Sequence, residues 1–282
     1  MRIALVYNER LKPDRMARVQ RLARILERRG HDVTHAFGDS FDCQRDAPDT
    51  KLVVMAGGDG TVRLVIAKQR DLSALPPLAI YPTGTINLLA RELGYSRDPE
   101  EFARRIEKQD KAVTTRIATV DGAPFIACAS IGVDAHSVAS VSEKLKLRIG
   151  RFAYLAALFV LFRDWPRIPM QLDTGEEQLE AEALFVLRGK HYAGRWTLDR
   201  QAHLAHEKLR VLALPRARRR DLLSLIAYAL AGSRKPHGHW RFFETERLRV
   251  SCDAPVAVQA DGDVAGHAPA TFELREDRVT FV

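Results

Sequence analysis

Cysteine is scarce in this sequence of 282 residues, and long apolar runs are missing. The three cysteines, Cys43, Cys128 and Cys252, lie far apart and form no C-x-x-C pair. We therefore expect neither a disulfide framework nor a structural zinc site, and a reducing cytoplasm is the natural environment. The longest apolar run is Tyr154–Phe162, far shorter than the roughly 20 residues of a membrane-spanning helix. These absences predict a protein that is soluble or bound to a membrane surface.

Three recognition signatures are absent as well. No G-x-x-x-x-G-K-[ST] segment occurs, so the chain is not a P-loop enzyme. Zinc-finger spacing and the aromatic-basic pattern of RNA-recognition domains are also missing, and we expect no nucleic-acid partner. The net charge of +8 then leaves an anionic membrane surface or phosphorylated substrates as partners. Met1–Tyr7 reads as a strand and not as a signal peptide, which favours a cytoplasmic protein that can reach the inner face of the membrane.

The first 115 residues alternate between strand and helix patterns. Short apolar runs predict strands, and apolar residues at helical spacing predict the helices between them. The expected strands are Arg2–Tyr7, Val33–Phe37, Leu52–Ala56 and Leu78–Tyr81, and the expected helices are Arg15–Arg29, a helix from Val62 onward, Ile86–Leu93 and Pro99–Gln109. This order predicts a doubly wound α/β domain at residues 1–115.

From residue 116 onward, short strand patterns and tight turns take over. Asp121-Gly122 predicts a hairpin between strands at Arg116–Val120 and Phe125–Ser130. A helical stretch is expected at about residues 140–163, followed by strands at Met170–Asp173, Ala183–Arg188, Leu209–Leu214, Arg247–Cys252, Ala254–Gln259 and Arg278–Val282. Residues 116–282 are therefore predicted to form a second, mostly β domain.

The most informative segment is LVVMAGGDGT at residues 52–61. Its strand ends at a loop made of Gly57, Gly58, Asp59, Gly60 and Thr61. Glycine amides carry no covering Cβ, so a polyphosphate can lie against such a loop, and the carboxylate and hydroxyl side chains stand at the same place. An ordinary strand-to-helix turn also uses glycine, and this segment alone leaves both interpretations open.

A second segment, residues 76–94, repeats the order of strand, glycine-containing turn and helix, with its turn at Pro82–Thr85. The two motifs together, GGDGT and P-x-G-T-x-N-x-x-A-R, resemble the catalytic domain shared by diacylglycerol, sphingosine and ceramide kinases. The first motif would also suit the related NAD kinases. The second motif points to the lipid kinases, and its matching residues are Thr85, Asn87, Ala90 and Arg91.

This resemblance implies a Rossmann-like N-terminal domain, a mostly β C-terminal domain and an active site in the cleft between them. It also implies magnesium-dependent transfer of the γ-phosphate of ATP to a hydroxyl of diacylglycerol, a sphingoid base or ceramide. Asp59 is the only carboxylate in the expected nucleotide site, where it could hold magnesium-bound phosphates or orient the acceptor hydroxyl. The residues expected to bind the nucleotide are Asn8, Gly57, Gly58, Asp59, Gly60, Thr61 and Thr85.

Asp263 and Asp59 are the predicted catalytic residues. The related kinases carry a D-G-E or D-G-D turn near the C-terminus, whose last carboxylate removes the proton of the lipid hydroxyl. The matching turn here is Asp261-Gly262-Asp263, so the resemblance implies Asp263 as the general base. The local pattern by itself favours an ordinary hairpin. Where the family has Glu, Asp263 is shorter by one C–C bond, about 1.5 Å.

Three stretches depart from the family pattern. Glu9-Arg10-Leu11 follows Asn8 in place of the P-x-S-G that contacts the nucleotide, and Arg63-Leu64 replaces a frequent Asn-Glu pair. Many bacterial members hold a structural magnesium with a D-D-G-x-L-D stretch, but the matching residues Ala205–Arg210 contain no aspartate. We therefore expect no metal there. The histidine pairs His203/His206 and His237/His239 are not expected to bind a metal either.

Two segments combine basic and apolar residues as membrane-contacting segments do. The first, residues 216–243, contains an amphipathic helix with arginines at its start and Trp240–Phe243 after it. A core-facing helix with a solvated basic end would show the same pattern. The second is Lys144–Arg151 followed by Phe152–Phe162.

The leading prediction is an ATP-dependent lipid kinase whose substrate lies at a membrane surface. NAD kinase activity is the enzymatic alternative because the first motif is shared. A nucleotide- or lipid-binding protein without catalysis is the third possibility, suggested by Glu9, Arg63 and the missing aspartates. No short motif reports the lipid head group, since the shape of the binding site selects it.

Overall fold

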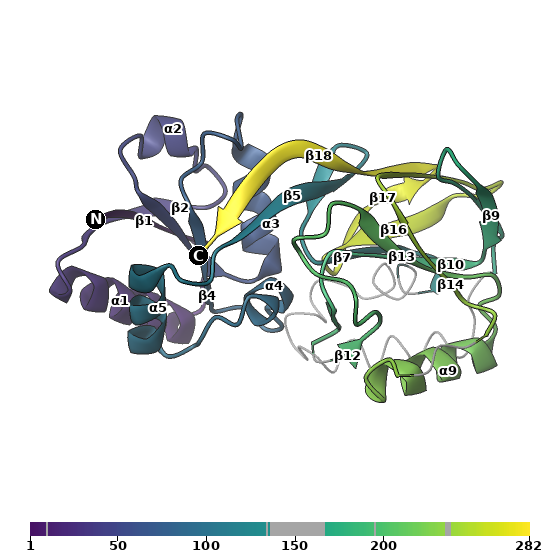
Figure 1. The fold of residues 1–282 in the computed structure, drawn as a ribbon. Coiled ribbons are helices and arrows are strands. Elements are labelled where there is room, and N and C mark those ends of the chain that lie inside the picture. Colours follow the sequence, from purple (N-terminus) through teal and green to yellow (C-terminus); the bar gives the residue numbers. More distant parts are fainter. Residues whose placement is uncertain (10, 134, 136–166, 195, 235–237) are drawn as a thin grey trace. The chain divides into compact units, whose positions relative to one another are not determined.

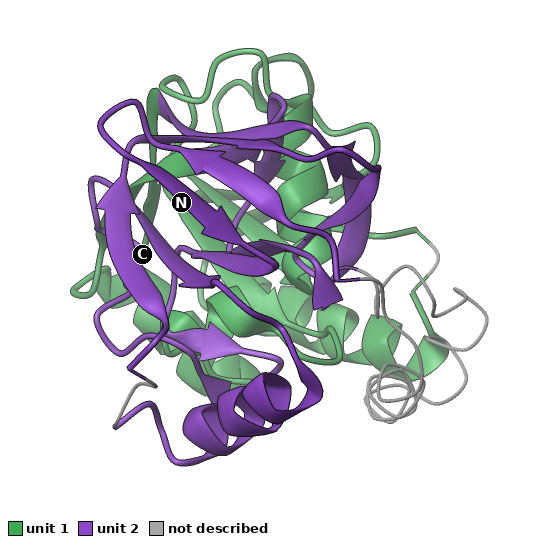
Figure 2. Ribbon diagram, turned by 90° about the vertical axis from the view of Figure 1, so that its right-hand side faces the viewer, with its two compact units in different colours: residues 1–117, 276–282 green, residues 118–275 purple. Residues whose placement is uncertain are grey.

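The computed structural model describes all residues except 10, 134, 136–166, 195 and 235–237. Within it the chain forms two compact units, Met1–Ile117 with Glu276–Val282, and Ala118–Arg275 (Figure 2). The sequence pattern predicts a division between residues 115 and 116, with the C-terminus in the second domain. The last residues return to the first unit because Phe281 pairs in parallel with Leu78, whose carbonyl accepts a hydrogen bond from the Val282 amide.

The first unit is built on a parallel sheet, shown with its helices in Figure 1. Its strands lie in the order β2-β1-β3-β4. Every residue of β3 and β4 is buried, as expected for central strands of a parallel sheet, whereas the edge strand β2 is mostly exposed. The bounds of the strands are Arg2–Tyr7 for β1, Asp32–Phe37 for β2, Leu52–Gly57 for β3 and Leu78–Pro82 for β4.

Helices α1 (Pro13–Arg28) and α5 (Pro99–Lys108) pack against each other in this unit. Helix α1 buries Val19, Leu22, Ala23, Ile25 and Leu26, which recur at helical spacing. Arg29, just after α1, forms ion pairs with Glu100 and Glu107 of α5. Both predicted helices are therefore confirmed, with ends that differ by one or two residues.

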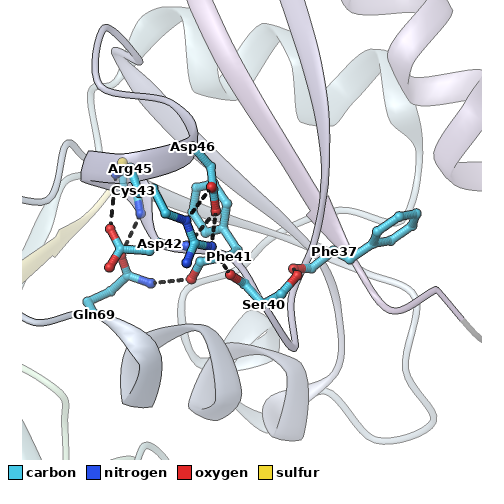
Figure 3. Close-up of polar contacts among 8 residues, drawn as sticks. All are labelled: Phe37, Ser40, Phe41, Asp42, Cys43, Arg45, Asp46 and Gln69. Carbon is cyan, nitrogen blue, oxygen red and sulfur yellow. Dashed lines mark hydrogen bonds and ion pairs between the residues drawn. The ribbon is translucent and has the colours of Figure 1, made fainter.

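The loop after β2 is fastened to the end of helix α3 (Asp59–Lys68) by Gln69. The Gln69 amide nitrogen donates to the carbonyl of Phe41 at 2.9 Å, and its oxygen accepts from the Cys43 amide at 2.9 Å (Figure 3). Gln69 and Phe41 are both buried. The short helix α2 (Cys43–Asp46) follows, with Asp42 as its N-cap. These contacts hold the C-terminal end of α3, whose N-terminal end carries the glycine-rich loop.

The second unit contains two larger antiparallel sheets (Figure 1) and the two-stranded antiparallel sheet β11-β12. One has the strand order β14-β13-β10-β7-β16-β17, and the other contains β18, β15, β8 and β9 in that order, with β5 pairing β18 and β6. Alternate residues of both sheets point into one apolar core, where the rings of Phe125 and Phe272 meet edge to face at 6.2 Å. This core confirms a mostly β second domain.

The local sequence patterns predicted the ends of some of these strands correctly and the ends of others incorrectly. Strands β8 (Met170–Asp173) and β13 (Leu209–Leu214) agree with the prediction at both ends. The strand predicted at 125–130 is two strands, and the helix predicted at about 140–163 lies outside the described residues. The remaining bounds are β5 Val113–Val120, β6 Ala123–Phe125, β7 Cys128–Ile131, β9 Gln178–Ala181, β10 Ala183–Leu187, β11 His191–Tyr192, β12 Trp196–Thr197, α9 Arg219–Leu230, β14 Arg241–Thr245, β15 Arg247–Ser251, β16 Val256–Ala260, β17 Asp263–Ala268 and β18 Ala270–Phe281.

Candidate active site

The loops that follow β1, β3 and β4 begin at the same edge of the parallel sheet. Tyr7 pairs with Ala56, and Gly57 pairs with Pro82, so these three strands end side by side. The carboxyl edge of a parallel sheet is where open α/β proteins bind ligands. The predicted nucleotide residues of the first unit are therefore gathered at one edge.

Two of the loop glycines are required by close packing, Gly84 against the other loop and Gly57 within its own loop. A Cβ added to Gly84 would lie 2.6 Å from the Gly58 Cα, and one added to Gly57 would lie 2.3 Å from the Thr61 Oγ1. Real Cβ atoms do not approach other atoms so closely. Gly60 differs, because a Cβ there would meet nothing within 4 Å. Of the three glycines in the GGDGT loop, Gly60 is the one whose exposed face leaves room for a ligand.

The Asp59 carboxylate joins the two glycine loops. Its two oxygens accept hydrogen bonds from the backbone amides of Leu88 and Leu89, each at 2.9 Å. These amides open helix α4 (Leu88–Glu92), so Asp59 caps this helix from a distant part of the chain. Burial raises the pKa of Asp59, and the two amide hydrogen bonds oppose the rise. The carboxylate therefore has a positioning role that the sequence did not reveal.

Asn87 holds the turn of the second motif and leaves a buried acceptor open. It adopts the left-handed conformation with φ 55°, and its Nδ2 donates to the Gly84 carbonyl at 2.8 Å. Within the described residues, the buried Asn87 Oδ1 and Thr83 Oγ1 have no hydrogen-bond partner. Buried polar atoms without partners are rare and call for a functional explanation. The matching N of the second motif was the available sequence signal for Asn87.

Arg15 brings a cation to the same loop. Its Nη2 donates to the exposed Thr85 Oγ1 at 3.2 Å. Arg15 lies in the first turn of α1, shortly after the altered Asn8 loop. No local sequence pattern links it to Thr85, because 70 positions separate the two residues. Asn8 itself is exposed, and its carbonyl accepts from the Leu11 amide at 3.2 Å. Arg10 lies outside the described residues.

Asp263 belongs to the second unit, at the first position of β17. Asp261 and Gly262 have φ values of 51° and 87° and form a two-residue turn between β16 and β17, so the predicted hairpin is confirmed. The Asp261 carboxylate accepts from the amides of Ile126 and Ala127, both at 2.8 Å. Asp263 is exposed beside this anchored turn. The turn is anchored by these hydrogen bonds, and the role of Asp263 as a base stays a prediction.

Comparisons with known proteins agree with this architecture. Residues 2–119 match the family model of the diacylglycerol kinase catalytic domain, and residues 127–282 match that of the YegS C-terminal NAD kinase beta sandwich-like domain. The chain belongs to the diacylglycerol kinase family of bacterial lipid kinases.

Its relatives are similar along nearly the whole chain. A diacylglycerol kinase of Staphylococcus epidermidis is 25% identical over 289 residues, covering 99% of this chain and 90% of that protein. A diacylglycerol kinase of Bacillus subtilis is 27% identical over 262 residues, covering 89% and 86%. The crystal structure of a diacylglycerol kinase from Bacillus anthracis shares the fold, with a TM-score of 0.76, 21% identity and coverage of 100% and 96%.

An NAD kinase from Archaeoglobus fulgidus, solved in complex with ATP, shares the fold at a TM-score of 0.56 with 17% identity, covering 100% of this chain and 93% of that protein. This similarity shows a shared fold. The family assignment itself rests on the matches to both domains of the lipid kinase family.

The family implies magnesium, and the residues of the two units differ in whether they could hold it. In the loops of the first unit, Asn87 Oδ1 has no hydrogen-bond partner. This oxygen would serve as one ligand of a hard cation, or accept a hydrogen bond from a water molecule bound to the cation. In the second unit, the carbonyls of Leu204, His206 and Lys208 already accept hydrogen bonds from the Arg188 guanidinium. The described residues contain no group of three or more His, Cys, Asp or Glu arranged for a metal ion. A structural magnesium does not fit this second place.

The predicted membrane segment at 216–243 is largely part of the second unit. Trp240 is buried against Tyr228, with ring centroids 5.2 Å apart, and Phe242 and Phe243 lie in β14, which pairs with β13. Trp240 is buried and Phe242 and Phe243 are half-buried, which agrees with the core-facing interpretation of these rings, and membrane contact through this segment stays a prediction. Lys144–Phe162 lies outside the described residues. Among the described helices, none is long and apolar enough to cross a membrane.

Proposed function

We propose that this family member transfers the γ-phosphate of ATP to a hydroxyl group of a membrane lipid. The observation that carries the proposal is the joined pair of glycine loops, in which Gly58 contacts Gly84 and the Asp59 carboxylate caps α4. This arrangement holds two loop segments at one sheet edge before any ligand arrives. Phosphoryl transfer depends on such positioning and on neutralisation of charge.

The phosphates are held by the first unit. The N-terminus of α3 carries a partial positive charge, and Gly60 leaves this end uncovered by a side chain. The Thr85 hydroxyl and the Arg15 guanidinium add a donor and a cation. Asn87 Oδ1 would supply a protein oxygen to a magnesium ion held mainly by the phosphates of the nucleotide. When bound, it neutralises negative charge on the phosphates.

Asp263 is the general base in this proposal. Its carboxylate accepts the proton of the lipid hydroxyl while the hydroxyl oxygen forms the new bond to the γ-phosphorus and ADP leaves. The Asp261 hydrogen bonds hold the turn that carries Asp263, so Asp261 is a positioning residue. A correctly placed base contributes about 10²–10⁴-fold to the rate.

The test is transfer of labelled phosphate from Mg-ATP to diacylglycerol, sphingosine and ceramide in mixed micelles, with mass identification of the product. Asp263→Asn should lower turnover by about 10²–10⁴-fold and leave folding and ATP affinity nearly unchanged. Asp263→Glu shows whether the shorter side chain already reaches the hydroxyl, since the longer one should then lower activity. ATP binding without product on the lipid panel would refute the kinase proposal. Formation of NADP from NAD would support the NAD kinase alternative.

Helix α9 is the proposed contact with the membrane surface. Leu223 and Leu230 are 55% and 62% exposed, whereas Leu222 and Leu225 on the other side of the helix are buried. The exposed arginines Arg216, Arg219 and Arg220 lie at the start of the helix or before it. An apolar stripe next to basic residues suits an anionic lipid surface.

Sedimentation with vesicles of phosphatidylglycerol and phosphatidylcholine tests this contact. The double variant Leu223→Glu with Leu230→Glu should bind the vesicles more weakly. Its turnover of a short-chain, water-soluble diacylglycerol should equal that of the wild type. Unchanged vesicle binding would show that the membrane contact lies elsewhere on the protein.

A further inference from the structure

In the second unit, a buried guanidinium gathers the carbonyl oxygens of the loop before β13. Arg188 directly follows β10 and is 2% exposed. Its Nη1 donates to the carbonyls of His206 and Lys208 at 3.0 and 3.1 Å, and its Nη2 donates to the carbonyl of Leu204 at 2.8 Å. Three alternate carbonyls of a short loop thus converge on one permanent cation. Convergence of this kind is also how proteins bind metal ions with backbone oxygens.

A second guanidinium lies at the end of the same loop. Arg210 donates from Nη2 and Nε to one oxygen of Asp199, at 2.6 and 2.8 Å, and from Nη1 to Glu244 at 2.6 Å. Its Nη2 also donates to the side-chain oxygen of Gln201 at 3.0 Å. Arg210 and Asp199 are both buried, at 9% and 5% exposure. Arg210 occupies the position where the family pattern has its last aspartate.

We infer that the chain supplies its own cations at this place: Arg188 and Arg210 replace the structural divalent metal that the family resemblance implies for residues 205–210. The carbonyl oxygens that a metal would need accept from Arg188, and the carboxylates of Asp199 and Glu244 accept from Arg210. Two arginines and two carboxylates balance in charge. A divalent ion at this place would add an uncompensated charge of +2 beside two guanidinium groups.

The Arg188 contacts have the form expected for a guanidinium. A guanidinium offers planar donors at ordinary hydrogen-bond lengths, and the three carbonyls lie at 2.8–3.1 Å from the Arg188 nitrogens. Magnesium needs its oxygen ligands in near-ideal octahedral geometry, and these three oxygens already serve as acceptors for Arg188. We therefore expect the fold of the loop not to depend on divalent ions in the solution.

Metal content and thermal stability test this inference directly. The purified protein is treated with EDTA, desalted and analysed for metals by mass spectrometry, and its Tm is measured with EDTA and with added magnesium. We expect no stoichiometric divalent metal and the same Tm in both buffers. A stoichiometric metal whose removal lowers the Tm would overturn the inference. Neither readout uses catalysis, so the result is independent of the proposed kinase function.

Arg188→Met removes the donors but keeps an unbranched, buried side chain. It should lower the Tm by about 5 °C or more, because three carbonyls lose their partner. Arg216→Met, at an exposed arginine of the same unit, is the matched control and should keep the wild-type Tm. A wild-type Tm for Arg188→Met would overturn the inference.

Arg188→Lys provides a second route if the Met variant does not fold. An ammonium group keeps the charge but cannot reproduce the planar donor pattern, so we expect a Tm below that of the wild type. Added magnesium should not restore it. Recovery of the Tm with magnesium in Arg188→Lys would show that the loop retains a metal site and would overturn the inference.

One consequence rests on the proposed function. If the only magnesium needed is the one bound to ATP, transfer should follow the concentration of the Mg-ATP complex and should not rise further with free magnesium. A second, activating dependence on free magnesium together with EDTA-sensitive Tm would overturn the inference. Absence of all transfer would refute the kinase proposal and leave the stability results valid.

Discussion

Replacing Asp59 by Asn tests whether the carboxylate acts by joining the two glycine loops. In the wild type, one oxygen accepts from the Leu88 amide and the other from the Leu89 amide, both at 2.9 Å. Asn keeps the size and one acceptor. Its NH2 group would face the other amide, where two donors cannot form a hydrogen bond. The start of α4 would then lose one of its two contacts with the first loop.

The expected cost follows from these two contacts. Hydrogen bonds to charged groups contribute about 1.5–3 kcal/mol each. Asp59→Asn removes one of them, and the relieved burial of the charge offsets part of that loss, so we expect a loss of at most about 3 kcal/mol in the free energy of unfolding. A change of 1 kcal/mol shifts the Tm of a domain of 150–250 residues by about 2–4 °C. The Tm should therefore fall by up to roughly 12 °C.

Two measurements separate the positioning role from direct phosphate binding. Thermal unfolding reports the loop contacts, and calorimetric titration with Mg-ATP reports the nucleotide site. A displaced α4 should lower both the Tm and turnover, the latter by about a hundredfold, because small misplacements at a reacting centre have large effects. A side chain that only bound magnesium-bound phosphates would leave the Tm unchanged and weaken Mg-ATP binding alone.

Asp49→Asn is the matched control for this variant. Asp49 is an exposed carboxylate of the same unit that pairs with Arg2 on the surface, and exposed ion pairs contribute about 0–1 kcal/mol. Its Tm and turnover should stay close to those of the wild type. A wild-type Tm for Asp59→Asn would refute the positioning role.

Three further predictions concern other parts of the molecule. Gly84→Ala should lower the Tm by several degrees in a melting experiment, because its Cβ would lie 2.6 Å from neighbouring atoms. Gly60→Ala should keep or slightly raise the Tm, because a Cβ there meets nothing within 4 Å, and it should weaken ATP binding measured by titration. Arg15→Met should weaken ATP binding by about tenfold with an unchanged Tm, and equal affinity would remove Arg15 from the nucleotide site. The hydrogen bond from Arg210 lowers the pKa of Glu244, so its contribution to stability is present at neutral pH and is lost as the pH falls through the lowered folded-state pKa. Denaturation between pH 7 and pH 3 should accordingly show a smaller acid-induced loss for Glu244→Gln, and identical pH profiles would contradict this.

The sequence by itself determined the features that short segments encode. The strand, turn and helix at each glycine loop follow from local apolar spacing, and both Asp-Gly turns have the positive φ values that such pairs favour. Strands β8 and β13 agree with their predicted bounds because turn-forming residues lie directly beside them in the sequence. The two glycine motifs also sufficed for the family, since their order and spacing lie within one stretch of about forty residues.

Only the tertiary structure decided which residues meet across long separations. Asp59 caps a helix that begins 29 positions later, Arg15 reaches Thr85 across 70 positions, and the last strand returns to the first unit. Arg188 likewise finds its carbonyl partners in a loop that no periodic pattern links to it. Local propensity acts over a few residues, whereas these contacts depend on strand order and on which donors remain to be satisfied once the chain is packed. For that reason the motifs predicted the chemistry of the nucleotide loops, and the fold decided what holds them in place.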